Sequence, residues 1–530
     1  MSNRELEYLS RRVASGGMSR RDFLGRAAAL GVAAPFAGSL LTTAAQAAQP
    51  VSGGTLTAGI QAGQSTDSLD PASWTNQVPT IFGRCWGEQL VRLTPDGKPI
   101  PNLASEWSSN DDATVWSFKI RKDVQFHNGK TMKPEDVVAT MERHSDAKSK
   151  SGALGIMQGI KSVKKDGENV VFTLKTANAD LPFLLEDYHL VIQPNGGQDD
   201  PKAGIGTGPY KVAEHQPGIR NVGKKFENYW NKGEVGHAEE VVILVINDAT
   251  ARMSALQGGK VQIINRVEPK IVHLVERLPG VTIQNTQGKG FYPFNMFCNT
   301  KPFDNNDVRM ALKLAVNREE MVKTILRGYG AVGNDYPINS AYPLSPEGIP
   351  QRTFDPDKAK HHIQKSGHDG PIVLRTSDVA FPGAVDAAQL YQQSCQQAGI
   401  NLQIQRVPGD GYWSEVWNKE PFSASYWGGR PTQDQMYSVA YISSADWNDT
   451  RFFNDKFDKL IVQARGELDE SKRKQMYHEA AMIMRDQGGL IAPMFNQFIA
   501  ATNDKVDGWV KDPNQEFSNL SALIRCWVKS

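Results

Sequence analysis

The chain is organised around residues 291–317, FYPFNMFCNTKPFDNNDVRMALKLAVN, whose pattern changes twice. Residues 291–298 form an almost wholly apolar, aromatic-rich run that is typical of a buried strand. Residues 299–306 are polar and show no periodicity. From Asp307 the apolar residues recur at helical spacing, with Asn306 or Asp307 able to cap the first turn. This predicts a strand that leaves one lobe and a helix that starts another with its own core, although a strand–loop–helix inside one large domain also fits.

Length and composition indicate a large folded protein. The chain has 530 residues, 40% of them hydrophobic, with 11 Trp, 14 Tyr and 21 Phe. These values suit roughly two to four domains and argue against disorder. The net charge is +1, and it becomes −2 without residues 1–47, which hold six Arg and three acidic residues. A charge so near zero, without basic blocks, predicts no nucleic-acid partner. We also expect a monomer.

The N-terminus has the pattern of an export signal. Ser19-Arg20-Arg21-Asp22-Phe23-Leu24 resembles the twin-arginine motif, and a mildly apolar region follows from Ala27 to Leu41. The triplet Ala45-Gln46-Ala47 is a small-x-small cleavage signal. We therefore expect residues 1–47 to be removed after Ala47. Because no Cys lies at the cleavage site, we expect a periplasmic protein without a lipid anchor.

Several blocks along the chain resemble family 5 extracellular solute-binding proteins, the periplasmic receptors of peptide and nickel ABC importers. The blocks are the FNMFCNTKPFDNNDVRMALKLAVNRE run that starts at Phe294, WSFKIRKDVQFHNGKTMKPEDV from Trp116, GTGPY from Gly206 and DPDKAK from Asp355. The resemblance covers essentially all of residues 53–500. It implies a transport receptor and not an enzyme, with a peptide or other small solute as ligand and the membrane subunits of an ABC permease as partner.

The resemblance also implies the architecture. We expect an α/β, two-lobed periplasmic binding protein of the type II-like, large class, with its lobes joined by two hinge strands. The first lobe would span residues 48–294, with an extra subdomain at about 88–205. The second lobe would span residues 295–493, with the returning hinge strand near its end. Residues 494–530 would rejoin the first lobe.

The segment from Tyr412 to Trp447 is rich in aromatic residues, with glycines and a few charged groups among them. Aromatic walls with few charges suit a pocket for a polar organic solute. The candidate ligand-binding residues are Trp413, Tyr426, Trp427, Gly428, Gly429, Arg430 and Asp434. Core packing is the alternative interpretation for some rings, and for Trp413 and Trp417 the two interpretations are equally supported.

At this segment the chain departs from its dipeptide-binding relatives. Those proteins have W-x-G-D, and the Asp binds the α-ammonium of the peptide; here Gly429 stands in place of that Asp. Either Asp434 reaches the amine, or the ligand has no free ammonium there. Arg430 could instead pair with a carboxylate or phosphate. A peptide or peptide-like solute is our first interpretation, and an acidic sugar- or opine-like conjugate is the alternative.

Motifs for other chemistries fail on their spacing. The Gly129-Lys130-Thr131 triplet lacks the upstream glycine of a phosphate loop, and neither a zinc-protease nor a hydrolase motif occurs. His361 and His362 are adjacent, so on a helix they point about 100° apart and cannot chelate one metal together. Four scattered cysteines favour buried thiols over a disulfide framework. We therefore expect no catalytic residues, no metal and no cofactor, and a periplasmic hydrolase is the less favoured alternative.

Overall fold

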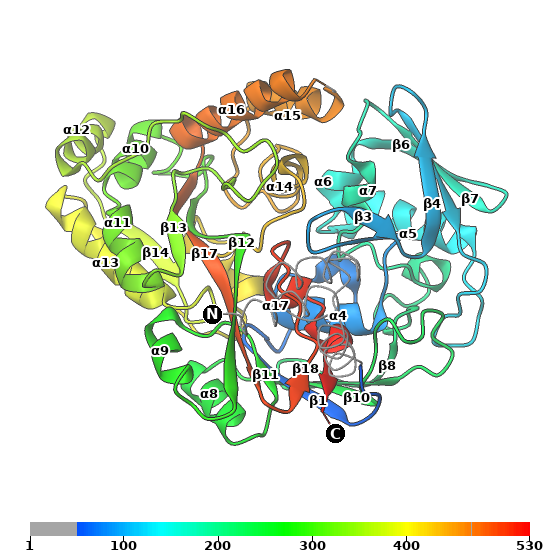
Figure 1. Ribbon diagram of the computed structural model, residues 1–530. Coiled ribbons are helices and arrows are strands. Elements are labelled where there is room, and N and C mark those ends of the chain that lie inside the picture. The colour runs from blue at the N-terminus through cyan, green and yellow to red at the C-terminus, as the bar shows by residue number, and fades with distance from the viewer. Residues whose placement is uncertain (1–49, 468, 530) are drawn as a thin grey trace, which may run out of the picture.

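The computed structural model describes residues 50–467 and 469–529, so the expected export signal lies outside the described residues. The chain is a mixed α/β protein whose largest sheet has 11 strands (Figure 1). In spatial order they are β15 (Leu402–Arg406), β14 (Ile372–Thr376), β16 (Phe422–Ala424), β12 (Val281–Met296), β17 (Leu490–Asn503), β11 (Ile263–Ile264), β1 (Thr55–Ile60), β10 (Glu240–Val245), β9 (Arg220–Lys225) and β8 (Tyr210–Gln216), with β13 (Gly330–Val332) paired to β17.

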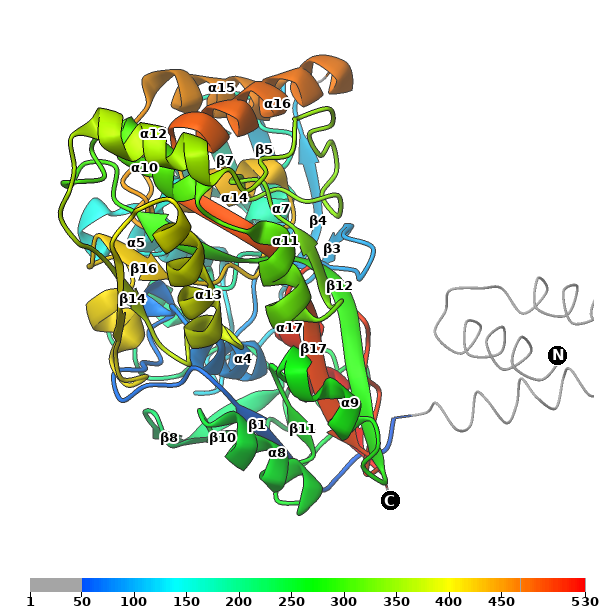
Figure 2. The ribbon, with the colours of Figure 1, turned by 90° about the vertical axis from the view of Figure 1, so that its left-hand side faces the viewer.

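Two long strands run through the whole molecule. β12 and β17 are antiparallel neighbours from Val281 opposite Asn503 to Asn295 opposite Leu490 (Figure 2). We call the elements around β1 and β8–β11 the first lobe, and those around β13–β16 the second lobe. The α/β, two-lobed fold that the sequence predicted is confirmed. The expected lobe boundaries, 294/295 and 493/494, fall inside these two strands and stay predictions.

The first hinge strand is longer than the apolar run 291–298 suggested. β12 begins at Val281, ten residues earlier than the run, because residues 281–287 keep their ladder with β17 although they are more polar and only partly buried. The helix predicted from Asp307 is α10 (Asn306–Leu314), and its cap is Asn305, whose side chain accepts a hydrogen bond from the backbone N–H of Asp307. The spacing of apolar residues therefore located β12 and α10, and the hydrogen-bonded ladder with β17 decided where β12 begins.

The first lobe carries a separate four-stranded sheet. Its order is β4 (Ala104–Ser109), β5 (Val115–Ile120), β7 (Asn169–Leu174) and β6 (Ile160–Asp166). Trp116, Phe118 and Ile120 recur every second residue in the sequence, a spacing typical of a strand, and on β5 all three side chains point inward. Helix α5 (Pro134–Ser145) packs on this sheet and has Pro134 in its first turn. The sheet lies inside the range 88–205 expected for the extra subdomain.

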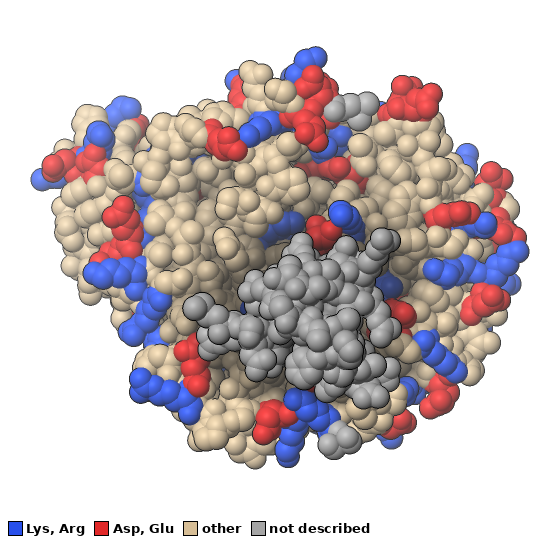
Figure 3. Space-filling model, in the orientation of Figure 1, with Lys and Arg blue, Asp and Glu red and all other residues tan. Residues whose placement is uncertain are grey.

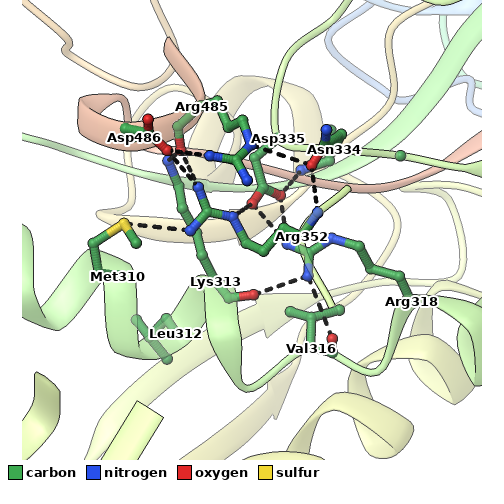
Figure 4. Close-up of polar contacts among 12 residues, drawn as sticks. Met310, Leu312, Lys313, Val316, Arg318, Asn334, Asp335, Arg352, Arg485 and Asp486 are labelled. Carbon is green, nitrogen blue, oxygen red and sulfur yellow. Dashed lines mark hydrogen bonds and ion pairs between the residues drawn. The ribbon is translucent and has the colours of Figure 1, made fainter. Parts of the chain in front are cut away.

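The second lobe has four longer helices and a buried ionic cluster. The helices are α12 (Pro356–Ser366), α13 (Ala384–Gln397), α15 (Asp455–Gly466) and α16 (Glu470–Gln487). Asp335 accepts hydrogen bonds from Arg318 at 2.6 and 2.7 Å, and Nε of Arg352 lies 3.0 Å from it (Figure 4). Asp335 also accepts the backbone N–H of Ala492 in β17. The cluster thus fixes an irregular loop to a hinge strand.

Lys313 caps the end of α16 from inside the same lobe. Its buried Nζ donates to the carbonyl oxygens of Met484, Arg485 and Gly488, at 3.3, 2.8 and 2.8 Å. A cation at a helix C-terminus satisfies carbonyl groups that would otherwise lack donors. Burial lowers the pKa of Lys313 to about 7.

The surface carries charges of both signs. On the face shown in Figure 3, basic and acidic side chains are interspersed around the edge, in keeping with the small net charge. Within the described part of the chain, every helix is either too short or too polar to cross a membrane. Cys85, Cys395 and Cys526 are buried free thiols, as expected, and Cys298 is a free thiol that is partly exposed.

Candidate functional site

A cavity lies between the two lobes, with an empty volume of about 430 Å³ that includes the open space at its mouth. Its lining residues are Thr75, Asn76, Gln77, Thr80, Tyr188, Trp413, Trp417, Tyr426, Trp427, Gly428, Arg430, Trp447 and Gln515. The first lobe supplies the start of helix α4 (Gln77–Trp86) and Tyr188. The second lobe supplies residues 413–447, and Gln515 comes from the C-terminal segment. Both lobes are therefore needed to form the cavity.

Two other hollows have larger empty volumes, about 670 and 840 Å³. One lies between the segment 268–270 and helix α13, and the other is lined by residues of both lobes that include Asp96, Pro431 and the paired Asp180 and Arg473. We place the candidate site in the smaller cavity because aromatic rings and buried polar groups from both lobes converge there, which is typical of ligand pockets.

Four tryptophans of the second lobe form one wall of the cavity. The Trp417 ring packs edge-on against Trp447 at 5.3 Å and against Trp427 at 6.3 Å between ring centroids. Trp413 packs against Trp417 at 6.3 Å and against Tyr426 at 5.1 Å. Trp413 lies in the π-helical turn η6 (Tyr412–Val416). Such edge-on contacts hold the rings in fixed orientations.

A buried carboxylate holds two of these rings. Oδ2 of Asp449 accepts hydrogen bonds from Nε1 of Trp417 at 2.9 Å, Nε1 of Trp427 at 3.2 Å and Nδ2 of Asn295 at 2.7 Å. Asn295 lies on the hinge strand β12. Burial raises the pKa of Asp449 to about 7, although the two indole donors act to lower it. Asp449 therefore orients the aromatic wall and attaches it to the hinge.

Arg430 reaches across to the first lobe. Its Nη1 donates to the carbonyl oxygen of Gly429 at 2.7 Å, and its Nη2 donates to the hydroxyl of Tyr188 at 3.3 Å. The guanidinium also lies 5.4 Å from the ring centroids of Tyr188 and Trp427. Oδ2 of Asp187 is 3.8 Å from Nε, beyond hydrogen-bond distance, and Nε has no partner. Arg430 is 2% exposed, so its charge is shielded from water.

Gly429 is required by its surroundings. Its φ is +90°, and a Cβ at this position would lie 2.4 Å from Cβ of Lys289 and 3.0 Å from the Lys289 backbone. A residue with a side chain would therefore be strained in backbone conformation and would clash with β12. The packing of this loop therefore leaves no room for an acidic side chain at position 429.

Hydrogen bonds join the lobes at the edge of the cavity. The side chain of Asp410 accepts from the backbone N–H of Ser65 at 2.7 Å and from its hydroxyl at 3.0 Å. Oε1 of Gln64 accepts the backbone N–H of Trp413 at 3.1 Å. These contacts form only when the first and second lobes are close, so the structure is a closed arrangement.

The structure brings most of the predicted site residues together. Trp413, Tyr426, Trp427, Gly428 and Arg430 line the cavity, and Gly429 lies next to it. Asp434 does not line it. Its two carboxylate oxygens share the single N–H of Nε of Arg465, at 3.0 and 3.1 Å, and one of them also accepts a hydrogen bond from the hydroxyl of Ser438. The interpretation in which Asp434 takes over the missing amine contact therefore has no support from the geometry.

Sequence reasoning missed the first-lobe side of the cavity. Thr75, Asn76, Gln77 and Tyr188 lie in segments with no motif of their own, and Gln515 lies in the C-terminal return. Trp447 belongs to the aromatic segment and could have been included from that signal. No pattern in the sequence pointed to the others, because their proximity is created by the closing of the two lobes.

The sequence comparison identifies the chain's relatives. The pattern of "Bacterial extracellular solute-binding proteins, family 5 Middle" matches residues 98–449, which is more than half of the chain. A dipeptide-binding protein of Escherichia coli K12 is 25% identical over 472 residues, covering 80% of this chain and 86% of that protein.

Two solved structures share the fold. A periplasmic binding protein of Helicobacter pylori in complex with the peptide STSA has a TM-score of 0.81 at 20% identity, and the match covers 91% of this chain and 99% of that one. A binding protein of A. tumefaciens R10 in complex with agropinic acid has a TM-score of 0.82 at 23% identity, covering 90% and 99%. With the family match over residues 98–449, these likenesses show that the chain belongs to the bacterial extracellular solute-binding proteins of family 5, which are transport receptors.

Proposed function

We propose that this protein is the periplasmic receptor of an ABC importer, and that it captures a peptide or peptide-like small polar solute between its lobes and delivers it to the membrane permease. The observation that carries the proposal is the cavity that both lobes build, with lobe-to-lobe hydrogen bonds at its edge. Closure of two lobes around a ligand is the established motion of such receptors. The ligand would bind to Trp413, Tyr426, Trp427, Gly428 and Arg430, with Gly429 shaping the loop.

The peptide class rests on the relatives. The dipeptide-binding protein and the complex with STSA are peptide binders by name, and the chain matches them over most of its length. An acidic sugar- or opine-like conjugate is the second candidate, because Arg430 is the charged residue that lines the cavity among the described residues.

Recovered ligand separates a receptor from an enzyme. Protein purified from the periplasm is denatured, and the released small molecules are identified by mass spectrometry. The empty, refolded protein is then incubated with the identified molecule. If the protein is a receptor, the bound molecule raises the melting temperature of the protein and is recovered chemically unchanged. Conversion of the molecule into a product would contradict the proposal and favour a periplasmic hydrolase.

We also propose that the precursor is exported by the twin-arginine route, is cleaved after Ala47 and functions as a monomer without a lipid anchor. The motif around Arg20 and Arg21 supports the route. Replacing both arginines by lysine should leave uncleaved precursor in the cytoplasm, as seen by fractionation and intact mass. Normal periplasmic yield from that double variant would contradict the route.

A further inference from the structure

The charges that face the cavity are not balanced. Of the described residues that line it, Arg430 is the one that carries a full charge. Its nearest acid is Asp187, but Asp187 is already used by His189, whose Nδ1 lies 2.6 Å from Oδ1 and whose backbone N–H also donates to it. Gln435 donates to the other oxygen of Asp187 at 3.2 Å.

His189 occupies the carboxylate of Asp187. Its Nε2 lies 3.1 Å from the carbonyl oxygen of Trp74, which can only accept a hydrogen bond. Its Nδ1 faces a carboxylate; burial alone would raise the pKa of Asp187, but His189 and Arg430 lower it to about 2. Asp187 is thus shared between His189, Gln435 and Arg430, and Nε of Arg430 stays 3.8 Å from it, beyond hydrogen-bond distance. Arg430 is 2% exposed, and a buried charge that is paired so incompletely is costly.

Three buried polar atoms of the lining have no hydrogen-bond partner: Nε of Arg430, Nε1 of Trp413 and Oε1 of Gln77. The side chains of all three residues are more than nine-tenths buried. Two of these atoms are N–H donors, which suit the oxygens of an anion. The acceptor on Gln77 suits a neighbouring N–H or O–H of the same solute.

The first turn of α4 adds to the positive potential. Gln77 is the first residue of this ten-residue helix, and Thr75, Asn76 and Thr80 also line the cavity. A helix N-terminus carries a partial positive charge, which favours an anion. In this helix the side chain of Asn76 already accepts the N–H of Val78, and Pro79 has no N–H, so the contribution of the helix is its dipole. The helix faces the cavity from the first lobe, and Arg430 enters it from the second.

No acid is free to receive an ammonium in the described part of the site. Asp187 is used by His189, and Asp434 by Arg465. Asp449 accepts hydrogen bonds from the indole rings and lies behind them. Asp67 lies behind Asn76 and accepts a hydrogen bond from Nδ2 of Asn76 at 2.6 Å. None of these four acids lines the cavity, and position 429 has no room for a fifth.

We infer that the cavity binds a carboxylate, or another oxyanion, of its solute between Arg430, the Trp413 indole and the first turn of α4, and that it holds no free ammonium there. This inference rests on the proposed function and specifies which end of the solute is bound. The anion can belong to a peptide, as its C-terminal carboxylate, or to a non-peptide acid.

The test compares four pools of small molecules on the refolded wild-type protein by native mass spectrometry and thermal shift. The pools are di- and tripeptides with free ends, the same peptides N-acetylated, the same peptides C-amidated, and sugar acids without an amine as non-peptide acids. We expect binding from the N-acetylated pool or the sugar-acid pool. For any peptide that binds, amidation should weaken Kd by about 30-fold or more, because it removes a buried charge pair.

The outcomes separate the inference from the proposed function. Binding of amidated but not N-acetylated peptides would overturn the inference and leave a peptide receptor. Binding of the sugar acids alone would support the inference and refute the peptide class. Binding from none of the carboxylate-bearing pools would refute the inference.

Variants give a second test with the tightest acid from these pools. Arg430→Gln should weaken Kd by about 30-fold or more, and Arg430→Lys should lose less because it keeps the charge. Arg220→Gln, which changes a partly exposed arginine paired with Glu214 in the first lobe, is the matched control and should bind as the parent does. Unchanged affinity in Arg430→Gln would overturn the inference. If Arg430→Gln does not fold, the binding of the four pools to the wild-type protein still tests the inference.

Discussion

Replacing Gly429 by alanine tests whether packing excludes a side chain next to Arg430. The left-handed backbone costs an alanine about 1–2 kcal/mol. The new Cβ would lie 2.4 Å from Cβ of Lys289, and because the neighbouring atoms include the backbone of β12 they cannot rotate away. Overpacking of this kind costs about 1–3 kcal/mol. We therefore expect Gly429→Ala to lose about 2–5 kcal/mol of unfolding free energy and to weaken solute binding.

Gly233→Ala is the matched control, because Gly233 has a φ of +91° and no atom lies within 4 Å of the place that a Cβ would take there. It should show the backbone cost alone. The assay is urea unfolding followed by tryptophan fluorescence and by circular dichroism, whose coincidence checks that one transition is measured. If Gly429→Ala is no less stable than Gly233→Ala, the contact with Lys289 does not exclude side chains. If Gly429→Asp folds normally and binds free dipeptides, the steric reasoning is wrong.

Four further predictions concern three acidic residues. Asp449→Ala should cost about 3–5 kcal/mol and shift tryptophan emission, because three N–H donors lose their acceptor; unchanged emission would show that the rings are held otherwise. Burial raises the pKa of Asp449 to about 7, so between pH 4 and 7 the native state keeps the carboxyl proton while the unfolded chain releases it. The free energy of unfolding should therefore fall as pH rises through this range, by about 1.4 kcal/mol per pH unit at most. Asp449→Asn should flatten this slope in urea melts at several pH values, and an unchanged slope would contradict the prediction. Asp410→Ala should weaken solute binding about 3- to 10-fold in calorimetry without lowering stability, since it removes two exposed hydrogen bonds to Ser65; equal affinity would mean that closure does not need them. Asp335→Ala should destabilise the protein by about 3–5 kcal/mol, because two buried arginines lose their partner; a smaller loss in urea melts would show that the lobe does not depend on the cluster.

Local pattern was sufficient for much of the fold. The apolar run at residues 291–298 and the helical period from Asp307 located a hinge strand and the first helix of the second lobe. The alternation in residues 116–120 located an inner strand of the small sheet. Whether these segments form a strand or a helix depends on residues within about ten positions along the chain, and the spacing of the hydrophobic residues predicts it directly. The ends of β12 could not be read in this way, because they depend on a partner strand about 200 residues later.

The sequence by itself also determined the family and the segment that builds one wall of the cavity, since aromatic residues cluster between Trp413 and Trp447 along the chain. Only the tertiary structure decided which charges are free there. Asp434 looked available in the sequence, but it pairs with Arg465. Arg430 is left incompletely paired because Asp187, its nearest acid, hydrogen-bonds His189 and stays 3.8 Å from Nε of Arg430. Charge pairing depends on distances of a few ångströms between distant segments, and such distances are set by the closing of two lobes rather than by local pattern.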